Sequence, residues 1–336
     1  MFFREKKMLT LAFLLVLAIA LFVQGCSSRQ SQPLKPAASD YPNRPVTMIV
    51  GWAVGGASDL LARASAQFFP KYANNQPLVV QNIPGSGGVP AVMEFTKAKP
   101  DGYTILHWNT AHVIKTHMSK VEYEATSFAP IIMMTKDYNY LLVKADSPYK
   151  NLNDFIEAAK KKNLSIANAG VGGGNHLAAL LFEDFVKVPF KHVPFDGGGP
   201  AVSALLSGVV DASMNIAPEG LSNVKSGQLR ILAVFSEQRI DLLSDVPTAK
   251  EQGLDLVLPQ WRGVVAHKDT PADIQKRLHD IFAQIMKDQE FLAKMKELGF
   301  GAFYMGPEEF GKFIQEDSAK YERVIKEHKL GDRYPK

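Results

Sequence analysis

Cysteine is nearly absent from this chain, since Cys26 is the single cysteine among 336 residues. One cysteine excludes a disulfide within the chain and a cysteine cluster around a metal ion. A strong excess of one charge is absent too: 38 basic against 34 acidic residues leave a formal net charge of +4. A charge this small and dispersed does not indicate a nucleic-acid-binding surface, so we expect no nucleic-acid partner.

The sequence also lacks the usual motifs of nucleotide binding, hydrolysis and metal binding. None of its glycine-rich turns carries the Lys and Ser or Thr of a phosphate loop. The run from Gly170 has Asn175 where a dinucleotide fingerprint needs its third glycine, and no Gly-x-Ser-x-Gly elbow occurs. His107, His112 and His117 are spaced by five and do not share a helix face, so we interpret them as ordinary surface or strand residues. We therefore expect no cofactor, no metal and no catalysis.

Residues 1–25 have the composition of a secretory signal. Arg4, Lys6 and Lys7 precede the unbroken apolar run LTLAFLLVLAIALFV, which ends at VQGC. A small residue followed by cysteine at this point resembles a lipobox, so we predict that Cys26 becomes the lipidated N-terminus. An uncleaved transmembrane anchor, or a stray thiol near an ordinary cleavage site, would be the alternatives. A cysteine used for lipidation cannot serve as a nucleophile.

A polar segment follows the cysteine. Residues 26–40 are rich in Ser, Pro and Gln and carry almost no apolar side chains, which is typical of a flexible tether. A lipid followed by such a tether anchors a protein to a membrane without spanning it. The sequence thus predicts an extracytoplasmic, lipid-anchored protein.

The rest of the chain alternates strand and helix patterns, which predicts an α/β fold with a mostly parallel sheet. Asn151 is predicted to cap a helix. Two apolar runs, 128–135 and 138–145, are separated by the polar pair Lys136-Asp137 and are expected to be two strands. Two long amphipathic helical stretches are expected at 270–300 and 307–328.

Glycine-rich turns recur where predicted strands end and helices begin. They are Gly55-Gly56, the run 85–88, the run 170–174 and the run 197–199. Ligands of open α/β sheets bind outside the carboxyl ends of the strands. The N–H groups and positive dipole end of each following helix suit an anion. Together these turns predict an anion site with little net charge.

Five motifs in order resemble the substrate-binding proteins of tripartite tricarboxylate transporters, also called the Bug family. They are YPNRPVTMIVGWAVGGASDLLAR, VVQNIPGSGGVPAVMEFTKAKPDGYTIL, IANAGVGGGNHLAALLF, HVPFDGGGPAVSALLSGVVDASM and LRILAVFSEQRIDLLSDVPTAKEQG. The resemblance covers residue 41 to about residue 306. It implies a two-lobed type II periplasmic-binding-protein (Venus-flytrap) fold. The first lobe would comprise residues 41–136 plus 262–336, the second residues 137–261, with the Lys136-Asp137 break as a hinge crossing.

The resemblance also implies a function. Family members bind small organic carboxylates through backbone N–H groups and bridging waters and pass them to membrane permease subunits. A receptor that reports its ligand to a membrane signalling kinase is the alternative that the sequence leaves open. A lipid-anchored hydrolase is a further rival, although no motif for its nucleophile is present.

Ligand-binding residues are carried over from the family onto the matching positions of this chain. They are Trp52, Ala53, Gly55, Gly56, Ala57, Ser58, Ser86, Gly87, Gly88, Asn109, Asn168, Gly173, Gly174, Asn175, His176, Asp196, Gly197 and Asn215. Trp52 and Val54 stand where the family often has Phe and Pro, and Gly174 where it commonly has Ser or Thr. These departures mark the places where ligand specificity can differ.

Several of these residues have a structural alternative. Asn109 could cap the following segment, and His176 could anchor a helix or pack between lobes. Asp196 could receive an ammonium or hydroxyl group of the ligand, or cap a helix. Asp59, next to the first loop, is expected to stabilise the first helical turn, because a carboxylate aimed at an anionic ligand is repulsive. Trp261 is expected to pack at the hinge.

Overall fold

The computed structural model describes residues 40–332, and the predicted signal segment, Cys26 and nearly all of the tether lie outside them. The strands are β1 (Val46–Val50), β2 (Leu78–Asn82), β3 (Thr104–Asn109), β4 (Ala129–Lys144), β5 (Ser165–Asn168), β6 (Lys191–Pro194), β7 (Ala212–Ile216), β8 (Leu229–Val234), β9 (Pro259–Ala266) and β10 (Ala302–Met305). The helices are α2 (Ala57–Tyr72), α3 (Val89–Thr96), α4 (Thr110–Met118), α5 (Leu152–Ala159), α6 (Gly174–Val186), α7 (Gly198–Leu206), α8 (Leu221–Lys225), α9 (Ala272–Ile285), α10 (Gln289–Leu298) and α11 (Pro307–Glu327).

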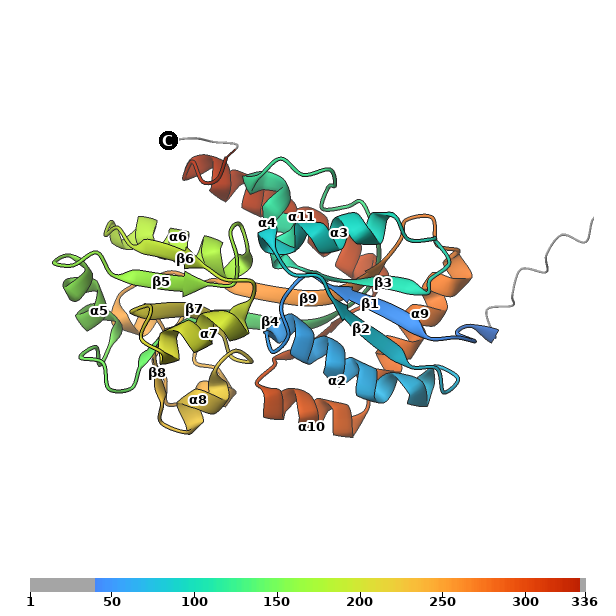
Figure 1. Ribbon diagram of the computed structural model, residues 1–336, viewed down its shortest axis with the longest axis horizontal. Coiled ribbons are helices and arrows are strands. Elements are labelled where there is room, and N and C mark those ends of the chain that lie inside the picture. Colours follow the sequence, from blue (N-terminus) through green and yellow to red (C-terminus); the bar gives the residue numbers. More distant parts are fainter. Residues whose placement is uncertain (1–39, 333–336) are drawn as a thin grey trace, which may run out of the picture. The chain divides into compact units, whose positions relative to one another are not determined.

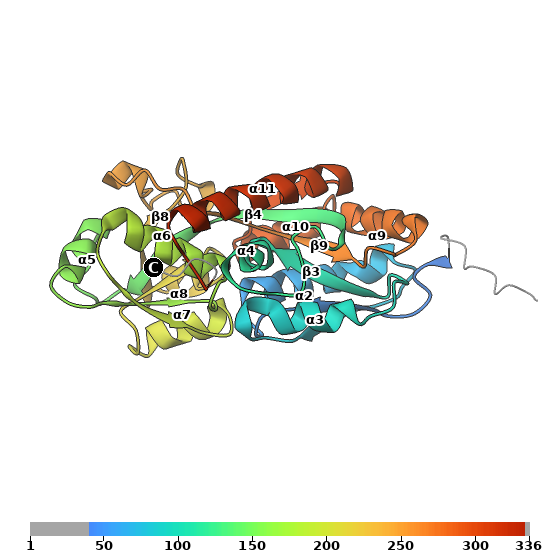
Figure 2. The same cartoon turned by 90° about the horizontal axis from the view of Figure 1, so that it is seen from above.

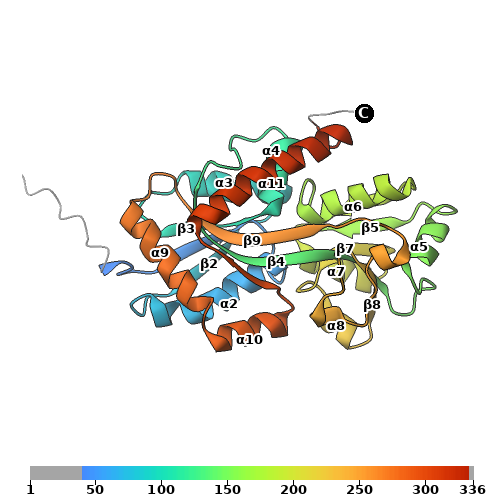
Figure 3. The same ribbon diagram turned by 180° about the vertical axis from the view of Figure 1, so that it is seen from behind.

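The strands form one mixed sheet in the order β2-β1-β3-β9-β4-β7-β5-β6, with β8 and β10 also paired to β4. We call β2, β1, β3, β9, β10 and the first part of β4 the first half-sheet. The second half-sheet is the last part of β4 with β7, β8, β5 and β6. β4 is common to both halves, and Figures 1 and 3 show β4 and β9 running together between them.

Helices cover both faces of each half-sheet. On the first half-sheet, α2, α9 and α10 pack on one face and α3, α4 and α11 on the other, with separate apolar cores beneath them. Figure 2 shows α11 along the same part of the sheet as β4 and β9. On the second half-sheet, α5 and α6 share one core and α7 and α8 another. Burial on both faces explains why the strands read as nearly continuous apolar runs.

Local signals account for many element boundaries. The predicted cap at Asn151 is confirmed, because its side chain accepts a hydrogen bond from the N–H of Asp154 at 2.9 Å. The alternation of strands and helices is confirmed from β1 to β8, whereas only two short 3-10 helices, residues 241–243 and 250–252, lie between β8 and β9. Helix α4, which directly follows β3, was not expected from the sequence. Its first turn is formed around Asn109, which both ends the strand and caps the helix.

Three expectations about the elements are wrong. β4 is one strand of 16 residues without a break at Lys136-Asp137, because Lys136 points outward while Asp137 is buried against Arg262 of β9. The sheet is mixed, since β9 is antiparallel to both β3 and β4. The expected helical stretch 270–300 is divided into α9 and α10, because Asp288 caps a new helix by accepting from the N–H of Glu290.

The fold predicts unequal effects for two phenylalanines three positions apart on α6. Phe182 is fully buried against Phe190 and Phe235, whereas 46% of Phe185 is exposed. We expect Phe182→Ala to lower the unfolding free energy by about 3–5 kcal/mol. Phe185→Ala should change it by about 0.5 kcal/mol or less. Urea unfolding followed by circular dichroism measures both, and equal losses would contradict the packing of α6.

Candidate ligand-binding site

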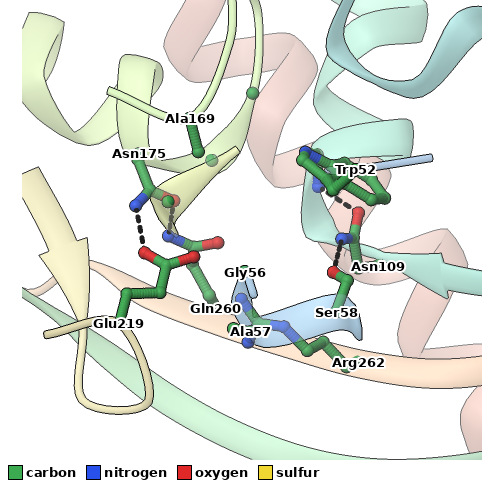
Figure 4. Close-up of a pocket in the computed structure, with 14 residues that line it drawn as sticks. Trp52, Gly56, Ala57, Ser58, Asn109, Ala169, Asn175, Glu219, Gln260 and Arg262 are labelled. Carbon is green, nitrogen blue, oxygen red and sulfur yellow. Dashed lines mark hydrogen bonds between the residues drawn. The ribbon is translucent and has the colours of Figure 1, made fainter. Parts of the chain in front are cut away.

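A small cavity lies where loops of the first half-sheet meet loops of the second. Its volume is about 10 Å³, and Figure 4 shows its surroundings. Its lining residues are Trp52, Gly56, Ala57, Ser58, Asn109, Ala111, Ala169, Gly173, Gly174, Asn175, Gly198, Glu219, Gln260 and Arg262. A cavity of this volume has room for about one water molecule, so a larger ligand requires the two sides to separate.

Three helices begin at this cavity without a side-chain cap. The N-cap residues of α2, α6 and α7 are Gly56, Gly173 and Gly197, and none of these helices has a side-chain hydrogen bond at its start. Helix N-termini carry unused N–H groups and a partial positive charge. Helix α4 differs, because the Asn109 side chain accepts from Ala111 and His112 and so occupies the N–H groups of its first turn. Three uncapped starts around one cavity form a site suited to an anion.

The loops on the two sides of the cavity touch directly. The N–H of Ala53, in the loop before α2, donates to the carbonyl of Asp196, in the loop before α7, at 2.9 Å. The Lys115 ammonium of α4 donates to the carbonyl of Val171, in the loop before α6, at 3.2 Å. A Cβ at Gly87 would lie 2.7 Å from that same carbonyl, so the loop before α3 also needs a glycine here. These contacts keep the cavity closed.

Asp59 stabilises the loop before α2 and does not line the cavity. Its buried carboxylate accepts from the N–H of Gly55 at 2.9 Å and from the Arg63 Nε at 2.9 Å. Asn82 at the end of β2 adds a third donor at 3.0 Å. The acidic residue therefore supports the first helical turn, as the sequence predicts.

An aromatic stack fixes Trp52 at the edge of the cavity. The Trp52 ring meets the His112 ring edge-on at 4.7 Å between centroids, and His112 is stacked on Trp108 at 4.6 Å. Burial holds the pKa of His112 well below its usual range, and the neighbouring His107 lowers it further. The pKa of His107 falls to about 3, mainly through burial. Both rings are therefore neutral at pH 7, and they are buried rather than at the surface.

A chain of amide and carboxylate groups lies along one side of the cavity. Gln260 of β9 donates to the Oδ1 atoms of Asn139 at 2.7 Å and Asn175 at 2.8 Å. Asn175 in turn donates to Glu219 at 3.1 Å, and Asn215 donates to the same carboxylate at 2.9 Å. A Cβ at Gly174 would lie 2.6 Å from the Gln260 side chain. The orientation of Glu219 is thus set by residues of both crossing strands and of the second half-sheet.

A buried ion pair joins the two crossing strands beneath the cavity. The Arg262 guanidinium of β9 donates to Asp137 of β4 at 3.1 Å, and both side chains are 3% exposed. Burial raises the pKa of Asp137 to about 6, whereas Arg262 and the N–H of Gly301 lower it. Burial lowers the pKa of Arg262, and the nearby carboxylates of Asp137 and Glu219 oppose this effect. At pH 7 both partners carry charge.

The cavity brings together eight of the residues predicted from the sequence: Trp52, Gly56, Ala57, Ser58, Asn109, Gly173, Gly174 and Asn175. Ala53, Asp196 and Gly197 lie instead in the contact between the loops before α2 and α7. Gly55, Ser86, Gly87, Gly88 and Asn168 are not among the lining residues. Asn109 has two roles, since it caps α4 and also donates to the Ser58 hydroxyl at 3.4 Å.

Two predicted residues support their neighbours and do not line the cavity. The Nδ1 of His176 accepts from the N–H of Gly172 at 3.0 Å, and its ring packs edge-on against His192. Asn215 is fully buried and donates to Glu219. His176 therefore anchors the loop before α6, which is one of its two expected roles.

The sequence interpretation missed Ala111, Ala169, Gly198, Glu219, Gln260 and Arg262. A signal was present for three of these residues. Gln260 and Arg262 are polar side chains two positions apart in an otherwise apolar strand, so both lie on one face of β9. Glu219 follows the carboxyl end of β7 and precedes Gly220, which is the usual place for a site residue in an α/β sheet.

The arrangement is that of a periplasmic binding protein: two α/β halves, joined by crossing strands, with a polar cavity between their loops. Residues 62–330 match the family model described as tripartite tricarboxylate transporter family receptor, so the chain belongs to that family, whose members are extracytoplasmic binding proteins. No helix among residues 40–332 is long and apolar enough to span a membrane. Within the same residues, no group of three His, Cys, Asp or Glu side chains could hold a metal ion.

Known proteins support this assignment over most of the chain. The protein BugT of Bordetella pertussis is 30% identical over 302 residues, which cover 87% of this chain and 91% of BugT. The structure of MatC from Rhodopseudomonas palustris with bound malate is 28% identical, with a TM-score of 0.80, covering 85% of this chain and 100% of MatC. The structure of the R. palustris protein Rpa4515 with adipate is 27% identical, with a TM-score of 0.83. It covers 87% of this chain and 99% of Rpa4515.

Gly198 and Glu219 should be energetically coupled. A Cβ at Gly198 would overlap the carboxylate of Glu219, which is held by Asn175 and Asn215. We expect Gly198→Ala to lower the unfolding free energy by about 1–3 kcal/mol, because Glu219 must leave its hydrogen bonds. In a Glu219→Ala background the same change should cost at least about 1 kcal/mol less. A double-mutant cycle by urea unfolding measures this coupling, and strict additivity would contradict it.

His176 should make the fold sensitive to acid. Burial lowers the pKa of His176 to about 4, and His192 and Lys115 lower it further. In the unfolded chain, the His176 side chain takes up a proton near pH 6.5, whereas in the folded protein it does so only near pH 4. Protonation therefore favours the unfolded chain, and the stability should fall as the pH drops from about 6.5 to about 4. The loss attributable to this residue is about 3 kcal/mol. His176→Asn should flatten that part of the melting-temperature profile, with His267→Asn as the control; identical profiles would refute the assignment.

Proposed function

We propose that this protein captures a small organic carboxylate outside the cytoplasm and delivers it to the membrane permease subunits of a tripartite tricarboxylate-type transporter. The observation that carries the proposal is the set of three uncapped helix N-termini at one cavity, those of α2, α6 and α7. Backbone N–H groups at such positions bind a carboxylate without a dedicated cationic side chain. The malate and adipate bound to two structural relatives are carboxylates of this kind.

Capture by closure fits the contacts across the cavity. The hydrogen bonds from Ala53 to Asp196 and from Lys115 to Val171 join loops on opposite sides, and they must break for a ligand to enter. β4 and β9 are the strands that run between the half-sheets, so the motion would centre on them. We accordingly propose residues 41–136 plus 262–336 as one lobe and 137–261 as the other. A ligand that contacts both lobes stabilises the closed state.

Lipidation at Cys26 completes the proposal. The apolar run that ends at VQGC and the polar tether after it are the sequence features in favour. A lipid-anchored receptor remains close to permease subunits in the same membrane, which favours transfer through a high local concentration. The protein itself carries out no chemical step in this scheme.

Carboxylate binding is tested by thermal shift against a panel that includes malate, adipate, succinate, citrate and amino acids. A ligand at one hundred times its dissociation constant stabilises the folded protein by about 2.7 kcal/mol. We expect at least one acid to raise the melting temperature by several degrees. The absence of any shift across the panel would refute carboxylate capture.

A matched pair of serines on α2 tests the location of the site. Ser58 and Ser65 are both buried, but Ser58 lines the cavity, whereas the Ser65 hydroxyl donates to the Leu61 carbonyl within the helix. We expect Ser58→Ala to weaken binding of the stabilising acid about tenfold, through the loss of one hydroxyl contact. Ser65→Ala should leave the affinity unchanged in isothermal titration calorimetry. Equal effects would place the site elsewhere.

A further inference from the structure

Glu219 is an acidic residue at a site built for anions. It lines the cavity and is 5% exposed, yet the carboxylate ligand proposed above carries the same sign of charge. Three hydrogen bonds hold its carboxylate in place, and all of them end on Oε2. The donors are the Asn175 side chain at 3.1 Å, the Asn215 side chain at 2.9 Å and the N–H of Ile216 at 3.4 Å. All three neighbours are donors, so the group acts as an acceptor, which is the role of an ionised carboxylate.

The other carboxylate oxygen has no partner. Among residues 40–332, no hydrogen bond reaches Oε1 of Glu219, and no Lys, Arg or His forms an ion pair with it. Figure 4 shows this oxygen turned away from Asn175, toward the side on which Gly56 and Ala57 lie. This oxygen is therefore free to accept a hydrogen bond from a group that enters the cavity.

The charges around the cavity do not balance. Glu219 at the cavity and Asp137 beneath it are two buried acids, and Arg262 is the one base among the lining residues. The Arg262 guanidinium donates to Asp137 at 3.1 Å; it attracts the Glu219 carboxylate too, but forms no hydrogen bond with it. Two buried acids share one base here, so Glu219 can still take a direct partner of opposite sign.

We propose that Glu219 binds a cationic nitrogen of the ligand, so that the ligand is a small amino carboxylate whose protonated amine lies a few bonds from its carboxylate. The proposal rests on the function proposed above, in which the helix N-termini hold the carboxylate. The spacing follows from Gly198, which lies against the Glu219 carboxylate and also against Gly56, the N-cap of α2. The amine and carboxylate positions are therefore close together.

A purely structural role for Glu219 predicts a different behaviour. Its Oε2 bonds and its backbone carbonyl, which accepts from the Tyr140 hydroxyl, hold the turn between β7 and α8. A glutamine at this position can keep its carbonyl oxygen toward Asn175 and Asn215 and turn its amide nitrogen toward the cavity. Glu219→Gln thus preserves the turn, removes the charge and replaces an acceptor by a donor. The substitution separates binding of a cation from support of the loop.

The test is isothermal titration calorimetry with acids that differ only in the amine: aspartate against succinate, glutamate against glutarate, and β-alanine against propionate. In the unmodified protein, we expect the amine-bearing acid with the highest affinity to bind at least tenfold more tightly than the matching acid that lacks the amine. Glu219→Gln should weaken the amine-bearing acid at least tenfold and change the amine-free acid less than threefold. Glu237→Gln, at an exposed position, is the matched control.

The outcomes separate this inference from the proposed function. Tighter binding of the amine-free acids, or an equal loss for both members of a pair in Glu219→Gln, would overturn the role of Glu219 and leave carboxylate capture standing. Binding of neither kind of acid by the unmodified protein would overturn the proposed function, and this inference with it.

Discussion

The buried ion pair between Asp137 and Arg262 is the interaction on which the site depends. It fixes β4 against β9 between the two half-sheets, so it sets the position from which Gln260 on β9 reaches Asn139 and Asn175. Breaking a buried pair of this kind leaves one charge without a partner and typically costs about 3–5 kcal/mol. The pair therefore holds the crossing strands in register while the loops on either side can separate.

The cavity combines two kinds of unsatisfied group. The uncapped starts of α2, α6 and α7 offer donors, and Glu219 offers an acceptor. Each can form hydrogen bonds with a ligand that supplies the complementary group.

Much of the fold could be predicted from the sequence, because its signals are local. Glycine turns after apolar strands located the loops before α2, α6 and α7, and Asn151 was a recognisable cap. The continuous strand β4 could not be predicted in this way. Lys136 and Asp137 look like a break until Arg262, 125 positions away, compensates the buried acid. A partner that is distant in the sequence can thus allow a charged residue to be buried within a continuous strand.

By itself, the sequence determined the strand–helix alternation, the glycine turns and the family, since these depend on backbone preferences and on motifs that are contiguous in the chain. Only the tertiary structure decided which turns share a cavity, and that Glu219 and Arg262 lie beside them. It also separated lining residues such as Ser58 from supporting ones such as Asp59. The reason is physical: burial, charge balance and hydrogen-bond partners are set by residues that are distant in sequence and adjacent in space.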